Sequence, residues 1–247
     1  MKTHCTRRRA SGFSLLEFIA VLVAVALLAV LSLVGLVVAR NKAQRLNCAD
    51  NLKEAGIAFE TWREEHNGNY PMQVALTNSD AMKLLGSGNA YVLWRSIGVL
   101  WPTNWLSTNW HASIQSGWDS QTNHDLFQKS LYCPADVNRT YATNFWDFTD
   151  ANVSYFFNLD AAGNHPQMIL DGDDNLAMDG VQVKPGILNL GDNNSVTWIK
   201  KRHQGVGNIG LVDGSVQQVT IGGLSTAILN STNGVPTNAV TPRWVIP

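Results

Sequence analysis

Residues 12–39, GFSLLEFIAVLVAVALLAVLSLVGLVVA, form the stretch that decides the fold of this chain. Between residues 18 and 39 only Ser32 and Gly35 interrupt the apolar side chains. An α-helix needs ~20 predominantly apolar residues to cross the hydrocarbon core of a bilayer. The stretch is long enough, and it predicts a single membrane-spanning helix near the start of the chain.

A short basic segment, MKTHCTRRRASG at residues 1–12, precedes the apolar stretch. An ordinary secretory signal has an apolar run of ~7 to 15 residues with a small-residue cleavage site on its far side. Here the apolar run is longer, and the small residues Ser11 and Gly12 stand before it. The pattern is therefore not that of an ordinary secretory signal.

The pattern GFSLLE resembles the prepilin leader of type IV pilins and of type II secretion pseudopilins. In that family a membrane-bound prepilin peptidase cuts after the glycine and methylates the new N-terminus. The resemblance implies cleavage between Gly12 and Phe13, with Phe13 as the N-methylated first residue. An uncleaved signal anchor is the alternative.

Glu17 is the one carboxylate in the apolar stretch. A charged side chain within a membrane helix costs ~2.5 to 3.5 kcal/mol on insertion scales, so such a residue is expected to be functional and to have a partner. Glu17 lies four residues after Phe13, about one helical turn from the amine that cleavage creates. The family resemblance implies that Glu17 pairs with the terminal amine of a neighbouring subunit during filament assembly.

Composition leaves room for one sizeable domain beyond the membrane segment of this 247-residue chain. The formal charge of −1 becomes −5 when four basic leader residues are removed (−1 − 4), which gives no support for nucleic-acid binding. Basic residues on both sides of the helix indicate orientation only weakly. The resemblance implies anchoring in the bacterial inner membrane with the C-terminal domain in the periplasm.

The periplasm is a compartment in which disulfides persist. Cys5 leaves with the leader, so the mature chain keeps only Cys48 and Cys133. These two residues are candidates for a disulfide, and two unpaired buried thiols are the alternative.

The membrane helix is expected to continue into water, because apolar residues recur at three- and four-residue spacing after residue 40. The stripe consists of Ala49, Leu52, Ala55, Gly56, Phe59 and Trp62. Gly68 and Pro71 supply the stop. We therefore expect a helix over residues 13–66, membrane-spanning to about residue 39, and a β-rich domain over residues 67–247.

The segment RHQGVGNIGLVDGSVQQV carries a second family signature, since His203 is separated by nine residues from Asp213 and Gly214. This spacing matches the H-X9-DG motif of a large group of pilin-like proteins. The segment LYCPADVNR at residues 131–139 also resembles a loop found in that group. The Asp-Gly dipeptide predicts a type I′ hairpin turn. His203 is expected to make a structural hydrogen bond that ties the hairpin, and a role as ligand or base is the alternative.

An acidic stretch follows the apolar residues MIL and is expected to form a loop after a strand. Calcium favours oxygen ligands clustered on flexible loops. The stretch therefore offers a candidate Ca²⁺ site, although it lacks the pattern of an EF-hand loop; a structural turn is the alternative. The candidate ligands are Asp171, Asp173, Asn175 and Asp179.

A tryptophan-rich segment occupies the middle of the chain, with Trp94, Trp101, Trp105, Trp110 and Trp118. Exposed tryptophans can stack on sugars, but tryptophan more often packs in cores and interfaces through its large buried area. A glycan-contacting surface is therefore an alternative interpretation of this segment.

Together these patterns predict an α+β protein, in which a long N-terminal helix packs on a mainly antiparallel β-sheet as in pilins. The expected function is that of a structural subunit, not an enzyme, in a type II secretion pseudopilus or type IV pilus-like filament. Its expected partners are prepilin peptidase, other pilin or pseudopilin subunits and the inner membrane. Two alternatives remain: a glycan-binding module on a pilin stalk, and a membrane-anchored hydrolase that uses His203 and Asp213.

Overall fold

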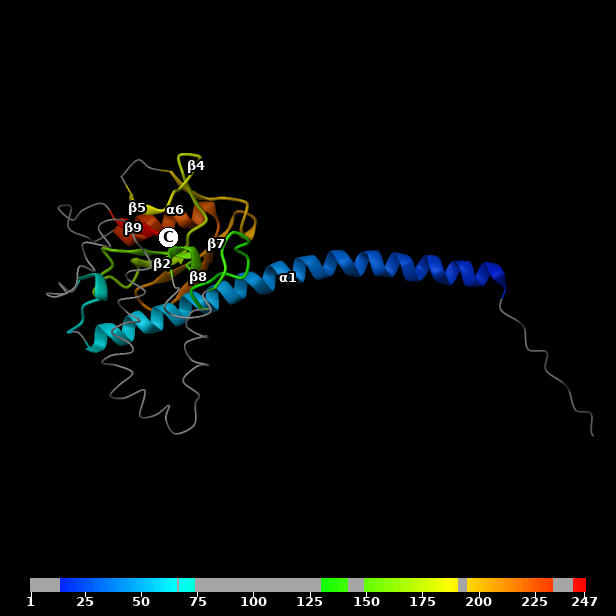
Figure 1. Cartoon of the computed structure of the whole chain (residues 1–247), viewed down its shortest axis with the longest axis horizontal. Helices are drawn as coiled ribbons and strands as arrows, with labels where there is room; N and C mark the ends of the chain where they lie inside the picture. Colours follow the sequence, from blue (N-terminus) through cyan, green and yellow to red (C-terminus); the bar gives the residue numbers. More distant parts are fainter. Residues whose placement is uncertain (1–13, 66, 74–129, 142–148, 191–194, 233–241) are drawn as a thin grey trace, which may run out of the picture. The chain divides into compact units, whose positions relative to one another are not determined.

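A computed structural model describes residues 14–65, 67–73, 130–141, 149–190, 195–232 and 242–247 (Figure 1). The chain divides into two compact units, Met1–Lys42 and Ala43–Pro247. Helix α1 runs through the boundary between them.

Helix α1 spans Leu15–Glu65 as one continuous element. Its N-terminus is closed by a capping box, because the Ser14 amide donates to Glu17 Oε2 at 2.9 Å and the Glu17 amide donates to Ser14 Oγ at 3.3 Å. Its C-terminus is closed by left-handed backbone at Asn67 and Gly68, whose φ angles are 56° and 81°. The helix therefore ends where Gly68 was expected to stop it.

The N-terminal part of α1 is exposed throughout, since every residue described between Ser14 and Arg40 is exposed. Among the residues that the structure describes, α1 is the one helix long and apolar enough to cross a membrane by length and composition. This agrees with single-pass anchoring of the chain.

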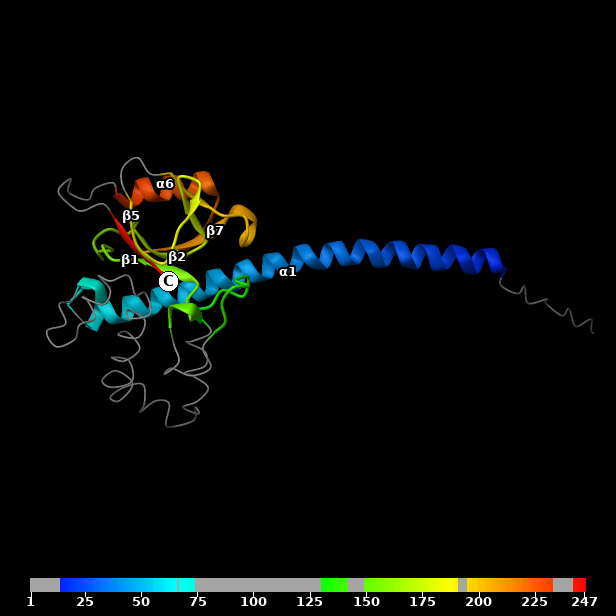
Figure 2. The ribbon, with the colours of Figure 1, turned by 45° about the horizontal axis from the view of Figure 1, so that its top comes forward.

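The C-terminal part of α1 buries the apolar stripe that the sequence predicts. Leu52, Ala55 and Phe59 are buried, and Cys48 lies on the same stripe one turn earlier. This part of the helix packs on the sheet of its own unit, as Figure 2 shows.

The described strands of the main sheet pair antiparallel in the order β5-β9-β1-β2-β7-β8. Its strands are β1 (Tyr155–Asn158), β2 (Ile169–Asp173), β5 (Gly186–Asn189), β7 (Gly207–Leu211), β8 (Val216–Val219) and β9 (Arg243–Ile246). A smaller antiparallel sheet has the order β4-β3-β6, from β3 (Leu176–Met178), β4 (Val181–Gln182) and β6 (Val196–Trp198). Helix α6 spans Ile221–Thr232, and 3-10 turns lie at Pro71–Gln73, Asp150–Asn152 and His203–Gly205.

The main sheet separates two hydrophobic layers, because successive strand residues point to opposite faces. Tyr155 and Phe157 face α1, whereas Phe156 faces α6 and the smaller sheet. On that second face the Phe156 and Trp244 rings stack with centroids 4.1 Å apart. The architecture is thus a long N-terminal helix and an antiparallel β-sheet domain, the α+β class expected.

Two local predictions were wrong. The acidic stretch does not begin a loop at residue 171, because β2 extends to Asp173 and buries both Asp171 and Asp173. The Asp213-Gly214 turn is not type I′, which needs positive φ at both central residues. Only Gly214 has it, at 79°, and the Gly214 amide donates to the Leu211 carbonyl at 2.9 Å, as in a three-residue loop closed by a left-handed glycine.

Candidate functional site

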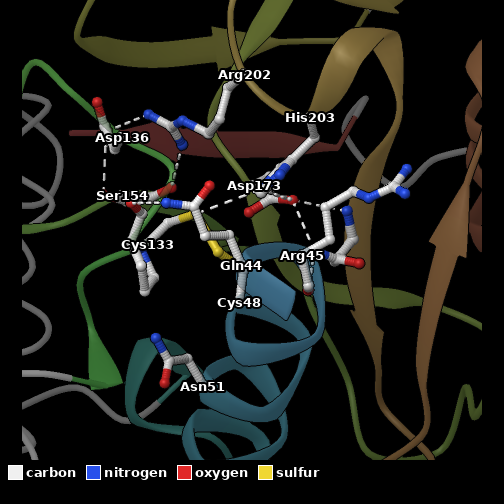
Figure 3. The surroundings of a disulfide bond; sticks show 12 residues. Gln44, Arg45, Cys48, Asn51, Cys133, Asp136, Ser154, Asp173, Arg202 and His203 are labelled. Atoms are coloured by element: carbon white, nitrogen blue, oxygen red, sulfur yellow. Dashed lines mark hydrogen bonds and ion pairs between the residues drawn. A yellow bond between two sulfur atoms is a disulfide. The ribbon is translucent and has the colours of Figure 1, made fainter. Parts of the chain in front are cut away.

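A disulfide joins Cys48 on α1 to Cys133 in the turn that follows Leu131 (Figure 3). Their Cα atoms lie 5.1 Å apart, their sequence separation is 85, and both residues are fully buried. Pro134 follows directly, and the Asp136 amide donates to the Cys133 carbonyl at 2.8 Å, which fixes the turn. Of the two alternatives for these cysteines, the structure has the bonded pair.

Neighbouring residues on α1 hold the same turn by hydrogen bonds. Gln44 Nε2 donates to the Pro134 carbonyl at 3.0 Å, and Asn51 Nδ2 donates to the Tyr132 carbonyl at 2.8 Å. Gln44, Cys48 and Asn51 lie four and three residues apart, so they share one face of the helix. The turn is therefore attached to α1 at three successive positions.

His203 lies against the disulfide. Its Nε2 atom is 3.3 Å from Cys133 Sγ and 3.6 Å from Asp173 Oδ2. The Asp173 carboxylate is held in turn by Asn208, whose amide and Nδ2 donate to Oδ2 at 2.7 and 3.1 Å. His203 thus contacts Cys133, in the turn bonded to α1, and Asp173, in β2. All three residues are buried.

Arg202, the residue before His203, lies between two buried carboxylates. Its Nη1 donates to Asp174 Oδ1 at 2.7 Å, and its Nη2 donates to Asp136 Oδ2. Arg139 donates to the same two carboxylates, which balances two positive with two negative charges. Burial acts to raise the pKa of Asp136, but Arg202, the Asn138 amide and Arg139 hold it below its usual value.

Three segments that are far apart in sequence therefore meet in this cluster. Asp136 belongs to the turn after Cys133, Asp174 lies within the acidic stretch, and Arg202 directly precedes His203. Removing one partner of a buried ion pair destabilises the folded protein by ~3 to 5 kcal/mol, because the other charge stays buried and unpaired. The cluster consequently fixes the mutual register of the three segments.

Burial also sets the protonation of the pair beside the disulfide. Burial, with the positive charges of Arg202 and Arg45, lowers the pKa of His203 to about 4, so its imidazole is neutral at neutral pH. Burial raises the pKa of Asp173 to about 7, and the charge of Arg202 opposes part of this rise. The pair is therefore close to the point at which Asp173 gains or loses its proton in neutral solution.

Asp171 is a second buried carboxylate on the same face of the sheet. Neither of its oxygens has a hydrogen-bond partner among the described residues, although the Gly210 backbone lies against Oδ1. Burial, and after it the charge of Asp173, raises the pKa of Asp171 well above its usual value. Burial therefore favours the protonated form of Asp171.

The four residues expected to bind calcium do not share one loop. Asp171 and Asp173 lie within β2, Asn175 Nδ2 donates to the Ile199 and Arg202 carbonyls, and Asp179 Oδ1 accepts the Ser195 amide at 3.0 Å. In the described part of the chain, one group of His, Cys, Asp or Glu side chains brings its ligand atoms within 4.8 Å of one another. That group is Cys48, Cys133, Asp173 and His203.

The H-X9-DG residues lie at opposite ends of one strand. His203 precedes β7 and Asp213 follows it, so a five-residue strand, ~17 Å long, separates them. Asp213 Oδ1 accepts the Ser215 amide at 2.9 Å and Gly214 closes the turn, while His203 contacts the disulfide. The expected bond from His203 to the hairpin turn is therefore a contact to Cys133 instead, and His203 and Asp213 do not form a catalytic dyad.

Sequence reasoning missed Arg202, Asp136 and Asn208 as members of the cluster. The available signal was weak: each is a polar residue beside an apolar strand or a cysteine, and spacing alone does not pair them.

Gly12, Phe13 and the tryptophan-rich segment lie outside the described residues. Glu17 is described, and it is exposed in the capping box of α1.

No protein-family model, curated protein or solved structure matches this chain.

Proposed function

We propose that this protein is a pilin-like subunit of a type II secretion pseudopilus or type IV pilus-like filament, processed by prepilin peptidase and assembled through its N-terminal helix. The observation that carries the proposal is α1 itself. It is one continuous helix whose first part exposes apolar side chains and whose second part is bonded to a β-sheet domain.

The exposed part of α1 needs an apolar partner. The large hydrophobic side chains that the structure describes from Leu15 to Val38 are at least half exposed, and they surround the helix instead of forming one stripe. A helix that is apolar all round is covered by lipid or by other helices. In our proposal lipid covers it in the inner membrane before assembly, and neighbouring copies of the same helix cover it afterwards.

Glu17 has a role in both states. In the single chain its Oε2 accepts the Ser14 amide and closes the first turn of α1. An ionised carboxylate offers about four acceptor positions, so this contact leaves room for a second donor. The proposed second donor is the methylated amine of Phe13 on an adjacent subunit, which would set the axial register between the two helices.

The disulfide and the buried cluster support a structural role for the domain. An oxidising compartment such as the periplasm preserves a disulfide. The charged side chains at the site are paired with one another, and the same four residues, Asp136, Arg139, Asp174 and Arg202, line a pocket of about 450 Å³. We therefore favour a mechanical function over a catalytic one.

Processing is the first test. The chain is expressed with an active prepilin peptidase, and the mature N-terminus is identified by mass spectrometry. We expect N-methylated Phe13, and a retained leader when Gly12 is replaced by a larger residue. An intact Met1 alongside a processed reference pilin in the same cells would contradict the proposal.

Assembly is the second test, with Glu17→Val compared with the matched control Glu54→Val, on an exposed site of the packed part of α1. We expect both variants to insert in the membrane and to lose the leader. Crosslinked or sheared multimers should disappear only in Glu17→Val, because only that change removes the partner of the Phe13 amine. Normal multimers from Glu17→Val would show that Glu17 is not an assembly contact.

A further inference from the structure

The disulfide lies inside a set of four metal-ligating side chains. Cys48 Sγ, Cys133 Sγ, His203 Nε2 and an Asp173 carboxylate oxygen all lie within 4.8 Å of one another, and all four residues are buried. With metal–ligand distances of ~2.0 to 2.3 Å, the ligand atoms of a tetrahedral zinc site are ~3.3 to 3.8 Å apart. The distances from His203 Nε2 to Cys133 Sγ and to Asp173 Oδ2, 3.3 and 3.6 Å, are close to these edges.

A structural disulfide does not require the other two residues. Burying a polar side chain costs free energy unless it gains partners. A histidine and a carboxylate buried against a disulfide therefore indicate a function that the disulfide alone does not explain. Backbone conformation adds to this cost, because His203 and Gln204 have φ angles of 55° and 59°, in the left-handed region that residues other than glycine seldom adopt. The chain therefore holds the imidazole at the cysteines against a local penalty.

The ligands are held by contacts that are independent of the sulfur–sulfur bond. Asn208 fixes the Asp173 carboxylate with two hydrogen bonds to Oδ2, and Asp173 Oδ1 has no hydrogen-bond partner among the described residues. Gln44 and the turn at Asp136 fix the backbone around Cys133. Such orientation of ligands by their neighbours is a general property of metal sites.

The donor types and the local charge favour zinc. Two thiolates, one imidazole and one carboxylate are ligands that Zn²⁺ accepts, whereas calcium requires oxygen ligands. Two thiolates, a carboxylate and Zn²⁺ together carry one negative charge. Arg202 and Arg45 lie near enough to His203 to act on it electrostatically and can balance that charge.

We propose that the dithiol form of this protein binds one Zn²⁺ ion through Cys48, Cys133, His203 and Asp173, in place of the disulfide. Formation of the site begins with reduction, in which a phosphine reductant gives two electrons to the disulfide and becomes a phosphine oxide with oxygen from water. The two sulfurs take up two protons as thiols. Zinc then displaces these protons and binds both thiolates, the neutral imidazole and the carboxylate. The proposal does not depend on the filament function.

The test uses the full chain in detergent micelles, prepared in two forms: disulfide-bonded, and reduced in denaturant with a phosphine and refolded without oxygen. Zinc bound after gel filtration is measured by atomic emission, and Co²⁺ serves as a spectroscopic probe. We expect about one zinc per reduced chain, little in the oxidised chain, and tetrahedral cobalt bands with thiolate-to-cobalt charge transfer. A folded reduced chain that binds neither metal overturns the proposal.

His203→Gln is the decisive variant, because it removes a ligand and leaves both cysteines. We expect its zinc affinity to fall about tenfold or more, since even removing an outer contact of a zinc site costs ~10- to 100-fold. His165→Gln, outside the cluster, is the matched control and should bind like the parent. Equal affinity in the two variants overturns the proposal.

The reduced chain also has a clear readout if it fails to fold without metal. In that case one equivalent of zinc should restore the near-ultraviolet circular dichroism of the parent and of His165→Gln, but not of His203→Gln. No restoration in the parent overturns the proposal. Equal restoration in all three proteins also overturns it, because zinc would then be held by the cysteines alone.

Discussion

The two parts of α1 use similar apolar residues in opposite ways. Leu28, in the N-terminal part, is 64% exposed, whereas Leu52, in the C-terminal part, is fully buried. Both belong to one helix with no break between them. The C-terminal part completes a folded domain, and the N-terminal part depends on an apolar environment supplied from outside the chain.

The contrast between the two parts of α1 shows that helix formation and helix burial are separate properties of the sequence. The N-terminal part is apolar all round, and the C-terminal part has an apolar stripe with Lys53 and Glu54 exposed beside it. The stripe allows a helix to pack on one sheet, while the uniform surface does not favour any one direction. The following predictions test how sharp the division is.

Loss of the disulfide should have the largest effect, and only on the packed part. Closing a loop of 85 residues stabilises the fold by ~4 to 5 kcal/mol in the chain-entropy model. We expect Cys48→Ser with Cys133→Ser to lower the free energy of unfolding of the sheet domain by about that amount. Urea denaturation without zinc, followed by tryptophan fluorescence, measures it.

Membrane insertion of the same double variant should be unchanged, since residues 15–39 are not altered. A variant as stable as the parent would show that the disulfide adds little to the packing of α1. A variant that no longer fractionates with membranes would contradict the division of the helix into two independent parts.

A leucine pair gives the next effect. Leu52→Ala removes a fully buried side chain and should cost ~2 to 5 kcal/mol of domain stability, including the cavity left behind. Leu28→Ala, the matched change in the exposed part, should leave the denaturation midpoint of the domain unchanged. Equal effects of the two substitutions would mean that Leu28 is also covered by the domain.

The buried carboxyl group of Asp171 should make the stability of the sheet domain depend on pH. Burial raises the pKa of Asp171 well above its usual value, whereas in the unfolded chain the pKa is ~3.9. Above pH ~4 the unfolded chain releases this proton and the folded chain retains it, so the free energy of unfolding falls as pH rises. Asp171→Asn removes this loss.

We expect Asp171→Asn to gain stability relative to the parent as the pH rises from 4 to 8. Denaturation curves at pH 4, 6 and 8 give the difference. Asp173 and His203 are present in both proteins, so the difference reports the loss of the Asp171 carboxyl together with its interaction with Asp173. Asp50→Asn, at an exposed site of α1, is the control. A constant difference across pH would contradict the raised pKa of Asp171.

The smallest effect should come from the cap of the exposed part. Ser14→Ala removes half of the capping box and should cost ~1 kcal/mol, which would speed amide exchange in the first turn roughly fivefold in micelles. Ser32→Ala, whose hydroxyl bonds the Leu28 carbonyl within the same helix, is the control. Unchanged exchange in Ser14→Ala would mean that the helix does not begin at Ser14.

Residue patterns predicted the helix well, because apolar periodicity and stop residues act locally. The stripe through Leu52 and Phe59 and the helix end near Gly68 both follow from neighbouring residues. The antiparallel sheet also agrees with the α+β class expected. Its pilin-like character remains a proposal.

The site was predicted less well, since its contacts join residues that are distant in sequence. Aspartate is seldom fully buried, so the acidic stretch predicts a loop, whereas Asp171 and Asp173 lie buried inside a strand. Nothing in the sequence pairs Arg202 with Asp136 and Asp174. His203 and Cys133 belong to separate motifs, and only the fold brings them together.

The disulfide also determines which residues bear tension when the two ends of the chain are pulled apart. Force entering through α1 reaches Cys48 and crosses the sulfur–sulfur bond to Cys133, so it bypasses residues 49–132. The bypassed residues form a covalently closed loop that carries no load. Mechanical strength is therefore independent of the length of this loop, and insertions there could lengthen the chain without making the subunit more extensible.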